Sequence, residues 1–205
     1  MASRSSPRPE TDTAPAPVAR RALLVAGAGC VLPAWASPEA ETWLRRGGVV
    51  LAMRHALAPG TFDPPGFTLG DCRTQRNLDD RGREQARAAG QWLAARGLQP
   101  SAVRSSPWCR CMDTATLGFG RAEAWDALGS PHGQPETTST AHLTALRAGL
   151  RRVAAQSSQF EVWVTHMFVL AALAGLNPAS GEGWVLQWRA DGTVAALARV
   201  AAPPI

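Results

Sequence analysis

The feature that most constrains the fold of this chain is a short apolar run that ends in two basic side chains. Residues 49–53 are all apolar, Arg54 and His55 follow them, and a loop rich in Gly and Pro then extends to Gly70. A short apolar run bounded by turn residues predicts a buried strand, and strands buried on both faces are typical of parallel sheets. In open α/β sheets ligands bind beyond the carboxyl ends of the strands, so we expect Arg54 and His55 at a ligand site.

Two further segments repeat this pattern of a strand followed by a basic group. Ala102–Ser105 is a candidate strand before a helix that carries Arg110 in its first turn, and Phe160–Thr165 is a candidate strand before His166. Because parallel strands end at one edge of a sheet, we expect these basic groups to lie together. Guanidinium groups bind phosphate oxygens, and a neutral imidazole is a nucleophile. The pattern therefore favours a pocket for a phosphate dianion.

Strands alternate with helices through the middle of the chain. Periodicity and capping residues predict helices over residues 37–46, 80–96, 106–117, 138–156 and 168–174, and a closing hairpin over 184–188 and 193–200. This alternation predicts an α/β fold, a three-layer α/β/α arrangement with a mostly parallel central sheet. We expect residues 37–205 to form a single domain, in which residues 118–137 have no readable pattern.

The first 36 residues differ in composition from the rest. Their first half is rich in Pro, Ser, Thr and Ala; Arg20 and Arg21 then precede a short apolar run, and a small-x-small pattern ends at Ala36. This order is typical of a signal peptide, so we expect a disordered N-terminus plus signal peptide over 1–36 and a periplasmic or secreted protein. The apolar run is short for a membrane span, and no stable membrane insertion is expected after cleavage. An N-terminal core helix is the alternative.

The charge of the chain bears on its partners. The formal net charge is +5, and no basic stripe with interleaved aromatic residues is present. We therefore expect no nucleic-acid partner and favour a small phosphorylated substrate.

Four motifs in a fixed order resemble those of one family. They are Arg54-His55 after a strand, Leu78-(x)3-Gly82-(x)2-Gln85-Ala86, Ser105-Ser106-Pro107 with Arg110 and Thr114-Ala115, and Val164-Thr165-His166. Over residues 48–175 the chain resembles the histidine phosphatase superfamily, the clan of phosphoglycerate mutases and acid phosphatases. The export pattern would make it an exported, bacterial-type member.

This resemblance implies a phosphomonoester hydrolase that works through a phosphohistidine intermediate. It implies that His55 is the nucleophile and that Arg54, Arg110 and His166 hold the phosphoryl oxygens. No cofactor and no metal are expected, because arginines can supply the charge that Mg²⁺ would otherwise bring.

Two positions depart from the family pattern. Ala56 stands where Gly usually follows the Arg-His pair, which matters only if the backbone there needs a positive φ. Met167 stands where Gly or Gln often follows the second His, which affects the rim of the pocket.

Three alternatives remain open at this point. The same site would serve a phosphomutase, and the fold would serve a non-catalytic module that binds phospholigands. A zinc site formed by Cys109, Cys111, His132 and His142 is the third, although this spacing matches no common zinc pattern.

The leaving alcohol needs a proton, and one carboxylic acid near it would supply this proton. In the resembled family the segment after the Arg110 helix covers the pocket, and its carboxylates here are Glu123, Asp126 and Glu136. We favour Glu136 because it lies near the start of the next helix and because its distance from Arg110 in the sequence resembles that of the acid in the mutase branch.

The loop after the first strand adds further candidates. Thr61 and Arg73 are expected to bind substrate. Cleavage after residue 36 would leave three cysteines in an oxidising compartment, so we expect Cys72 to pair with Cys109 or Cys111.

Overall fold

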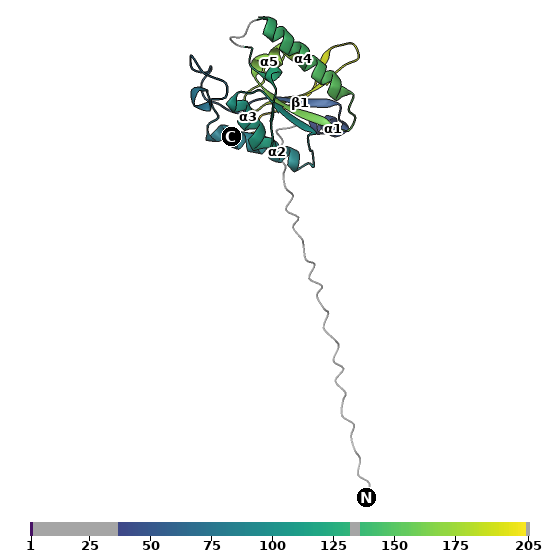
Figure 1. Cartoon of the computed structure of the whole chain (residues 1–205). Helices are drawn as coiled ribbons and strands as arrows, with labels where there is room; N and C mark the ends of the chain where they lie inside the picture. The colour runs from purple at the N-terminus through teal and green to yellow at the C-terminus, as the bar shows by residue number, and fades with distance from the viewer. Residues whose placement is uncertain (2–36, 132–135, 204–205) are drawn as a thin grey trace. The chain divides into compact units, whose positions relative to one another are not determined.

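The computed structural model describes Met1, residues 37–131 and residues 136–203. Expectations for the N-terminal segment, including the signal peptide, lie outside these residues. Within them, helices pack on both faces of one sheet (Figure 1). In chain order the elements are α1 (Pro38–Arg46), β1 (Val49–Arg54), η1 (Cys72–Thr74), α2 (Asp80–Ala94), β2 (Ala102–Ser105), α3 (Cys109–Phe119), β3 (Glu123–Ala124), η2 (Asp126–Leu128), α4 (Glu136–Ala154), β4 (Phe160–Thr165), α5 (Met167–Ala174), β5 (Gly183–Trp188) and β6 (Val194–Val200).

The described strands form one sheet with the order β3-β2-β4-β1-β5-β6. Strands β3, β2, β4 and β1 are parallel, whereas β5 and β6 are added as an antiparallel hairpin. The register pairs Val49 with Phe160 and Arg54 with Thr165, so β1 and β4 end side by side. The predicted three-layer fold with a mostly parallel sheet is confirmed, and the segments that follow β1 and β4 leave the sheet at the same edge.

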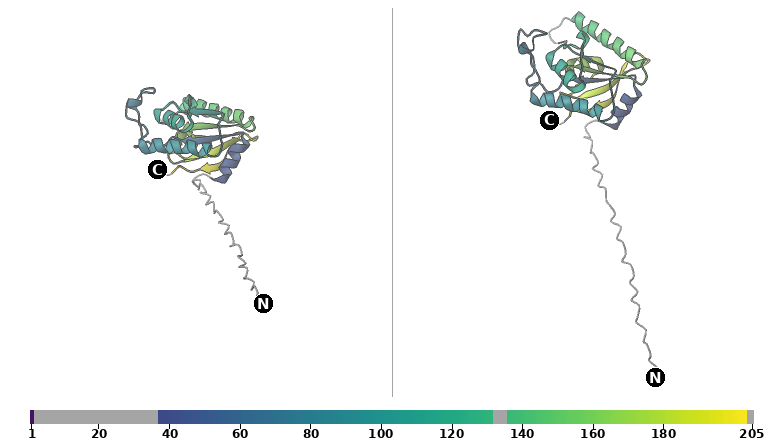
Figure 2. Two further views of the ribbon diagram at one scale, coloured as in Figure 1. Left: turned by 90° about the horizontal axis from the view of Figure 1, so that it is seen from below. Right: turned by 60° about the horizontal axis from the view of Figure 1, so that its bottom comes forward.

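Alternation along β1 separates the two halves of the core. Leu51 and Met53 pack with the apolar residues of α1, α2 and α3, whereas Val50 and Ala52 pack with those of α4 and α5. Successive side chains of a strand point to opposite faces, so a strand that is apolar throughout must be covered on both. Figure 2 shows these two helical layers on either side of the sheet.

Helix boundaries follow local chemistry. Ser37 caps α1 by accepting a hydrogen bond from the Ala40 amide at 3.2 Å, and Asp79 caps α2 through the Gly82 amide at 2.7 Å. The segment without a readable pattern contains the two-residue edge strand β3 and the short turn η2. Elements of two or three residues are too short to carry a periodic signal.

None of the helices in the described part of the chain has the length and apolar character that a bilayer crossing requires.

Candidate active site

His55 directly follows β1 and is held by backbone hydrogen bonds on both sides. Its amide donates to the Thr165 carbonyl at 2.9 Å, and its carbonyl accepts from the Gly181 amide at 3.0 Å. The imidazole is buried, and its Nδ1 lies 2.7 Å from the Ala56 carbonyl oxygen. Because a carbonyl can only accept, Nδ1 carries the proton and Nε2 keeps its lone pair.

Arg110 connects the two histidines from the first turn of α3. Its Nε lies 3.3 Å from His55 Nε2, and one terminal nitrogen lies 3.4 Å from His166 Nδ1. His166 Nε2 lies 2.8 Å from the Ser106 hydroxyl, which gives the Ser-Ser-Pro motif a physical purpose: it orients the second imidazole. The structure thus brings together the residues that the strand ends predicted.

The electrostatics of the pocket keep both imidazoles neutral. Burial lowers the pKa of His55 to about 3, and the guanidinium groups of Arg110, Arg76 and Arg54 act in the same direction. Burial also lowers the pKa of His166 well below its ordinary value, and His55 and the arginines add to the effect. A neutral imidazole with an unprotonated ring nitrogen is the form that can act as a nucleophile.

Arg54 occupies the same pocket from the end of β1. One terminal nitrogen donates to the Pro178 carbonyl at 3.2 Å and lies 4.0 Å from Met167 Sδ. Among the described residues Arg54 Nε has no hydrogen-bond partner. The pocket has a volume of about 410 Å³ and is lined by both histidines and by Arg54, Arg76 and Arg110.

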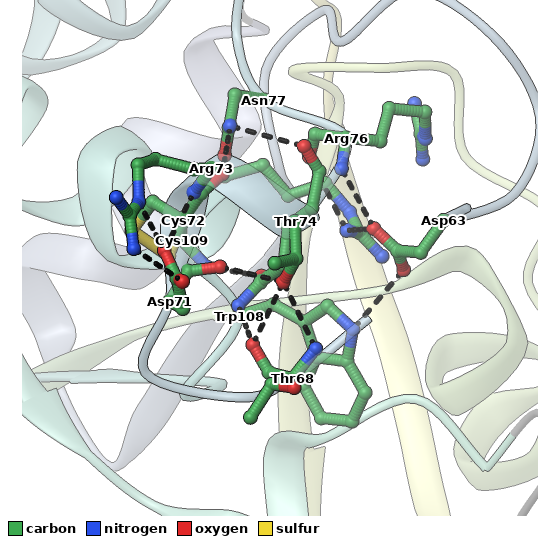
Figure 3. The surroundings of a disulfide bond; sticks show 12 residues. Asp63, Thr68, Asp71, Cys72, Arg73, Thr74, Arg76, Asn77, Trp108 and Cys109 are labelled. Atoms are coloured by element: carbon green, nitrogen blue, oxygen red, sulfur yellow. Dashed lines mark hydrogen bonds and ion pairs between the residues drawn. A yellow bond between two sulfur atoms is a disulfide. The ribbon is translucent and has the colours of Figure 1, made fainter. Parts of the chain in front are cut away.

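The second half of the pocket comes from the loop after β1. Asp63 pairs with Arg110 at 2.8 Å. It also accepts the Arg76 amide at 3.0 Å and the Trp108 indole N–H at 3.2 Å (Figure 3). The sequence interpretation selected neither Asp63 nor Arg76. Asp63 could have been predicted as a site residue, because a carboxylate that is buried in a phosphate-binding loop must pair with a nearby cation.

A disulfide fastens this loop to α3. Cys72 is bonded to Cys109 (Figure 3). Cys109 directly precedes Arg110, and Cys111 is free and buried. The predicted pairing of Cys72 with Cys109 or Cys111 is confirmed with Cys109 as the partner. The zinc alternative loses Cys109, and His132 lies outside the described residues. Within the described segments no group of three or more His, Cys, Asp or Glu side chains is arranged to hold a metal ion.

The second motif positions the backbone just after His55. Gly82 packs so closely against the Leu57 carbonyl that a Cβ there would lie 1.9 Å from its oxygen. The Gln85 side chain accepts the Leu57 amide at 2.9 Å and donates to the Ser180 carbonyl at 3.1 Å. The motif therefore places the chain that leaves the sheet rather than contacting a ligand itself.

The two departures from the family pattern are accommodated. Among the described residues other than glycine, only Ser158 has a positive φ, so Ala56 stands in an ordinary backbone conformation. Its amide donates to the Thr114 hydroxyl at 3.0 Å, which gives the Thr-Ala pair of the third motif a function. Met167 lines the pocket at the start of α5.

Of the two loop residues predicted to bind substrate, one lines the pocket and the other does not. Thr61 lines the pocket. Arg73 is not among the described lining residues: its side chain is 89% exposed and pairs with Asp71 at 2.9 Å. The loop arginine in the pocket is therefore Arg76, because the short turn η1 directs Arg73 outward to a local carboxylate.

The candidate proton donors lie apart from this lining. Glu136 opens α4, is exposed, and is not among the described lining residues. Glu123 lies on the exposed edge strand and pairs with Arg104 at 3.0 Å, and Asp126 begins η2.

Comparison with known proteins agrees with this fold. The family model of the histidine phosphatase superfamily (branch 1) matches residues 68–128, which include Gly82, Gln85 and Arg110. A comparison with curated protein sequences gives no match.

Solved structures share the fold. The protein histidine phosphatase SixA complexed with tungstate has a TM-score of 0.52 and 19% identity, over 75% of this chain and 96% of that chain. The product of an open reading frame of Mycobacterium tuberculosis has a TM-score of 0.53 and 18% identity, over 75% and 97%. The mycobacterial glucosyl-3-phosphoglycerate phosphatase in its native form has a TM-score of 0.51 and 19% identity, over 77% and 100%.

These findings first define the class: an α/β protein with a cationic pocket at the carboxyl edge of its sheet. Residues 68–128 match the model of the histidine phosphatase superfamily (branch 1), and the solved structures show that the chain shares the fold of such phosphatases.

Proposed function

We propose that the protein is a phosphomonoester hydrolase that works through a phosphohistidine formed on His55. One observation carries the proposal: His55 Nε2 keeps its lone pair inside a buried pocket lined by three guanidinium groups. Those groups neutralise the charge on the phosphoryl oxygens, which lets a neutral nucleophile approach phosphorus.

The reaction has two steps. In the first, the His55 Nε2 lone pair forms a bond to phosphorus, and the bond to the leaving oxygen breaks with its electron pair. In the second, water attacks phosphorus, the P–N bond breaks, and its electron pair returns to Nε2 while inorganic phosphate leaves. Arg54, Arg110 and His166 hold the phosphoryl oxygens in both steps. Because arginines supply the positive charge, we propose that neither a metal nor another cofactor is needed.

The test of this proposal is the His55→Ala variant. Hydrolysis of para-nitrophenyl phosphate should fall to background, and labelled phosphate trapped in the wild type by a quench without acid should be absent. His142→Ala is the matched control, since His142 lies half-buried on α4 outside this pocket. Full activity in His55→Ala, with an unchanged circular dichroism spectrum, would refute the proposal.

The proton for the leaving alcohol is a separate proposal. Asp63 is held by three donors as a hydrogen-bond acceptor, which suits a carboxylate better than a carboxylic acid. We keep Glu136 as the proposed donor. Glu136→Gln should cripple hydrolysis of alkyl phosphates and nearly spare para-nitrophenyl phosphate, whose leaving group hardly needs a proton. Equal loss on both substrates, or none on either, would remove Glu136 from the mechanism.

We also propose that the protein is exported. The support is the pattern of Arg20, Arg21 and the apolar run that leads to Ala36, together with the Cys72–Cys109 disulfide, which is typical of oxidising compartments. N-terminal sequencing of protein from its host should begin near Ser37, and an intact Met1 or Ala2 would contradict export.

A further inference from the structure

The charged part of the pocket matches one phosphate group and no more. Its lining contains three guanidinium groups, of Arg54, Arg76 and Arg110, and one carboxylate, of Asp63. With both imidazoles neutral, these four groups carry a net charge of +2. A phosphate monoester carries close to two negative charges at neutral pH. The other lining residues that the structure describes are uncharged, so in this part of the chain no second cationic subsite faces the leaving group.

The uncharged part of the lining is mostly aromatic and apolar. It consists of Phe62, Pro64, Pro65, Phe67, Trp108, Met167 and Phe168, with Gly60, Thr61, Gly66 and Ser130 between them. Phe62 is 56% exposed and Phe168 is 43% exposed, although most large apolar side chains of the described residues are buried. A group of exposed aromatic side chains beside a polar site marks a surface that binds a ligand.

The Trp108 ring of this wall is held in place before any ligand arrives. The buried Trp108 ring is fixed by its hydrogen bond to Asp63, lies edge-on to His166 at a centroid distance of 5.2 Å, and is 6.0 Å from Phe67. The next residue, Cys109, is bonded to the loop through Cys72. A preorganised aromatic surface loses little conformational entropy on binding, so a flat apolar group gains most of its contact energy there.

We infer that the pocket selects monophosphates whose phosphorylated group is an uncharged aromatic ring. The inference rests on the proposed function and names its substrate class. Net charge limits the ligand to one phosphate, and the wall of Phe62, Trp108 and Phe168 takes the ring. The chemistry agrees: a phenolic oxygen has a pKa of about 10, so it leaves with the P–O electron pair more readily than an alkoxide and takes its proton from water. Substrates with a second phosphate or a carboxylate lack a partner on this wall.

Binding of non-hydrolysable phosphonates to the full chain tests this inference separately from catalysis. Isothermal titration calorimetry should give a Kd for benzylphosphonate at least about tenfold lower than that for methylphosphonate, because only the ring reaches the wall. Phosphonoacetate, which adds a carboxylate, should bind no more tightly than methylphosphonate. Phe62→Ala and Phe168→Ala should each bring the ratio of the benzyl and methyl Kd values toward one.

Leu69→Ala is the matched control. Leu69 is a similarly exposed apolar residue of the same loop, 44% exposed and outside the pocket lining, so its loss should leave the ratio unchanged. Equal Kd values for benzyl- and methylphosphonate, tightest binding of phosphonoacetate, or a ratio that neither Phe variant alters would overturn the inference. Those outcomes leave the proposed function standing. In contrast, full activity in His55→Ala would overturn the proposed function, and failure of all three phosphonates to bind would overturn both.

Discussion

The two halves of the pocket are held by different means. The sheet-edge half, formed by Arg54, His55, Arg110 and His166, is fixed through the backbone: the His55 amide bonds to the Thr165 carbonyl. The loop half, formed by residues 60–67 and 76, is fixed through side chains. Asp63 bridges to α3, the Gln75 side chain accepts the Cys109 amide at 3.0 Å, and a disulfide joins the loop to the same helix.

This difference suggests that the sheet-edge half carries out the reaction and that the loop half selects the substrate. Nucleophilic attack needs a fixed geometry, and a strand paired on both sides provides it. The loop contributes contacts with the rest of the substrate, and loops can vary without disturbing the sheet. We therefore expect changes in the sheet-edge half to lower kcat and changes in the loop half to raise KM or lower selectivity.

The largest effect that sharpens this comparison comes from two nearby arginines of the loop. Arg76→Gln removes a guanidinium group from the pocket lining and should lower kcat/KM on the order of a hundredfold, chiefly through a higher KM, the scale of losing a hydrogen bond to a charged group. Arg73→Gln removes an exposed arginine that, within the described part of the chain, pairs with Asp71, and it should change kcat/KM by less than about twofold. Steady-state kinetics with para-nitrophenyl phosphate measures both. A larger loss for Arg73→Gln would mean that the loop takes another arrangement when substrate binds.

A smaller effect is expected from opening the disulfide. The double variant Cys72→Ser/Cys109→Ser should lower the free energy of unfolding by about 2–4 kcal/mol, because the unfolded chain gains the entropy of an open loop between residues 72 and 109. Since only the loop half is released, KM should rise more than kcat falls. Urea unfolding and steady-state kinetics measure the two effects.

Reductant provides the control for this variant. It should reproduce the change in the wild type and have no further effect on the double Ser variant. A fall in kcat with KM unchanged would contradict the division between the two halves.

A third effect concerns the sheet-edge half and depends on pH. The pKa of His55 is about 3 in the folded protein, below its ordinary value of 6.5, so between these values the unfolded chain binds a proton that the folded chain does not. Stability should therefore fall as the pH falls from 6.5 toward 3, by up to about 1.4 kcal/mol per pH unit for each such histidine.

Urea unfolding at pH 7.5 and pH 5 measures this dependence. His55→Gln should make it shallower. An equally steep dependence in the wild type and in His55→Gln would contradict the lowered pKa of His55.

The sequence by itself determined the sheet-edge half. The buried run of β1 ends at Arg54, β4 ends before His166, and Arg110 lies in the first turn of the helix after β2. Their meeting therefore needs only the rule that parallel strands end together. The cap at Ser37 could also be predicted, because capping depends on local chemistry. The pairing of Cys72 could be narrowed to two partners, because only three cysteines follow residue 36.

Tertiary structure decided the loop half. Residues 57–79 have no periodicity, so no pattern states which side chains face inward. Arg73 and Arg76 differ in sequence by three positions, yet the turn η1 and the bond from Cys72 to Cys109 direct one to solvent and leave the other beside Asp63. These two orientations depend on contacts between the loop and α3, which lies more than thirty residues away along the chain. Such contacts form only when the folded sheet brings the loop and α3 together.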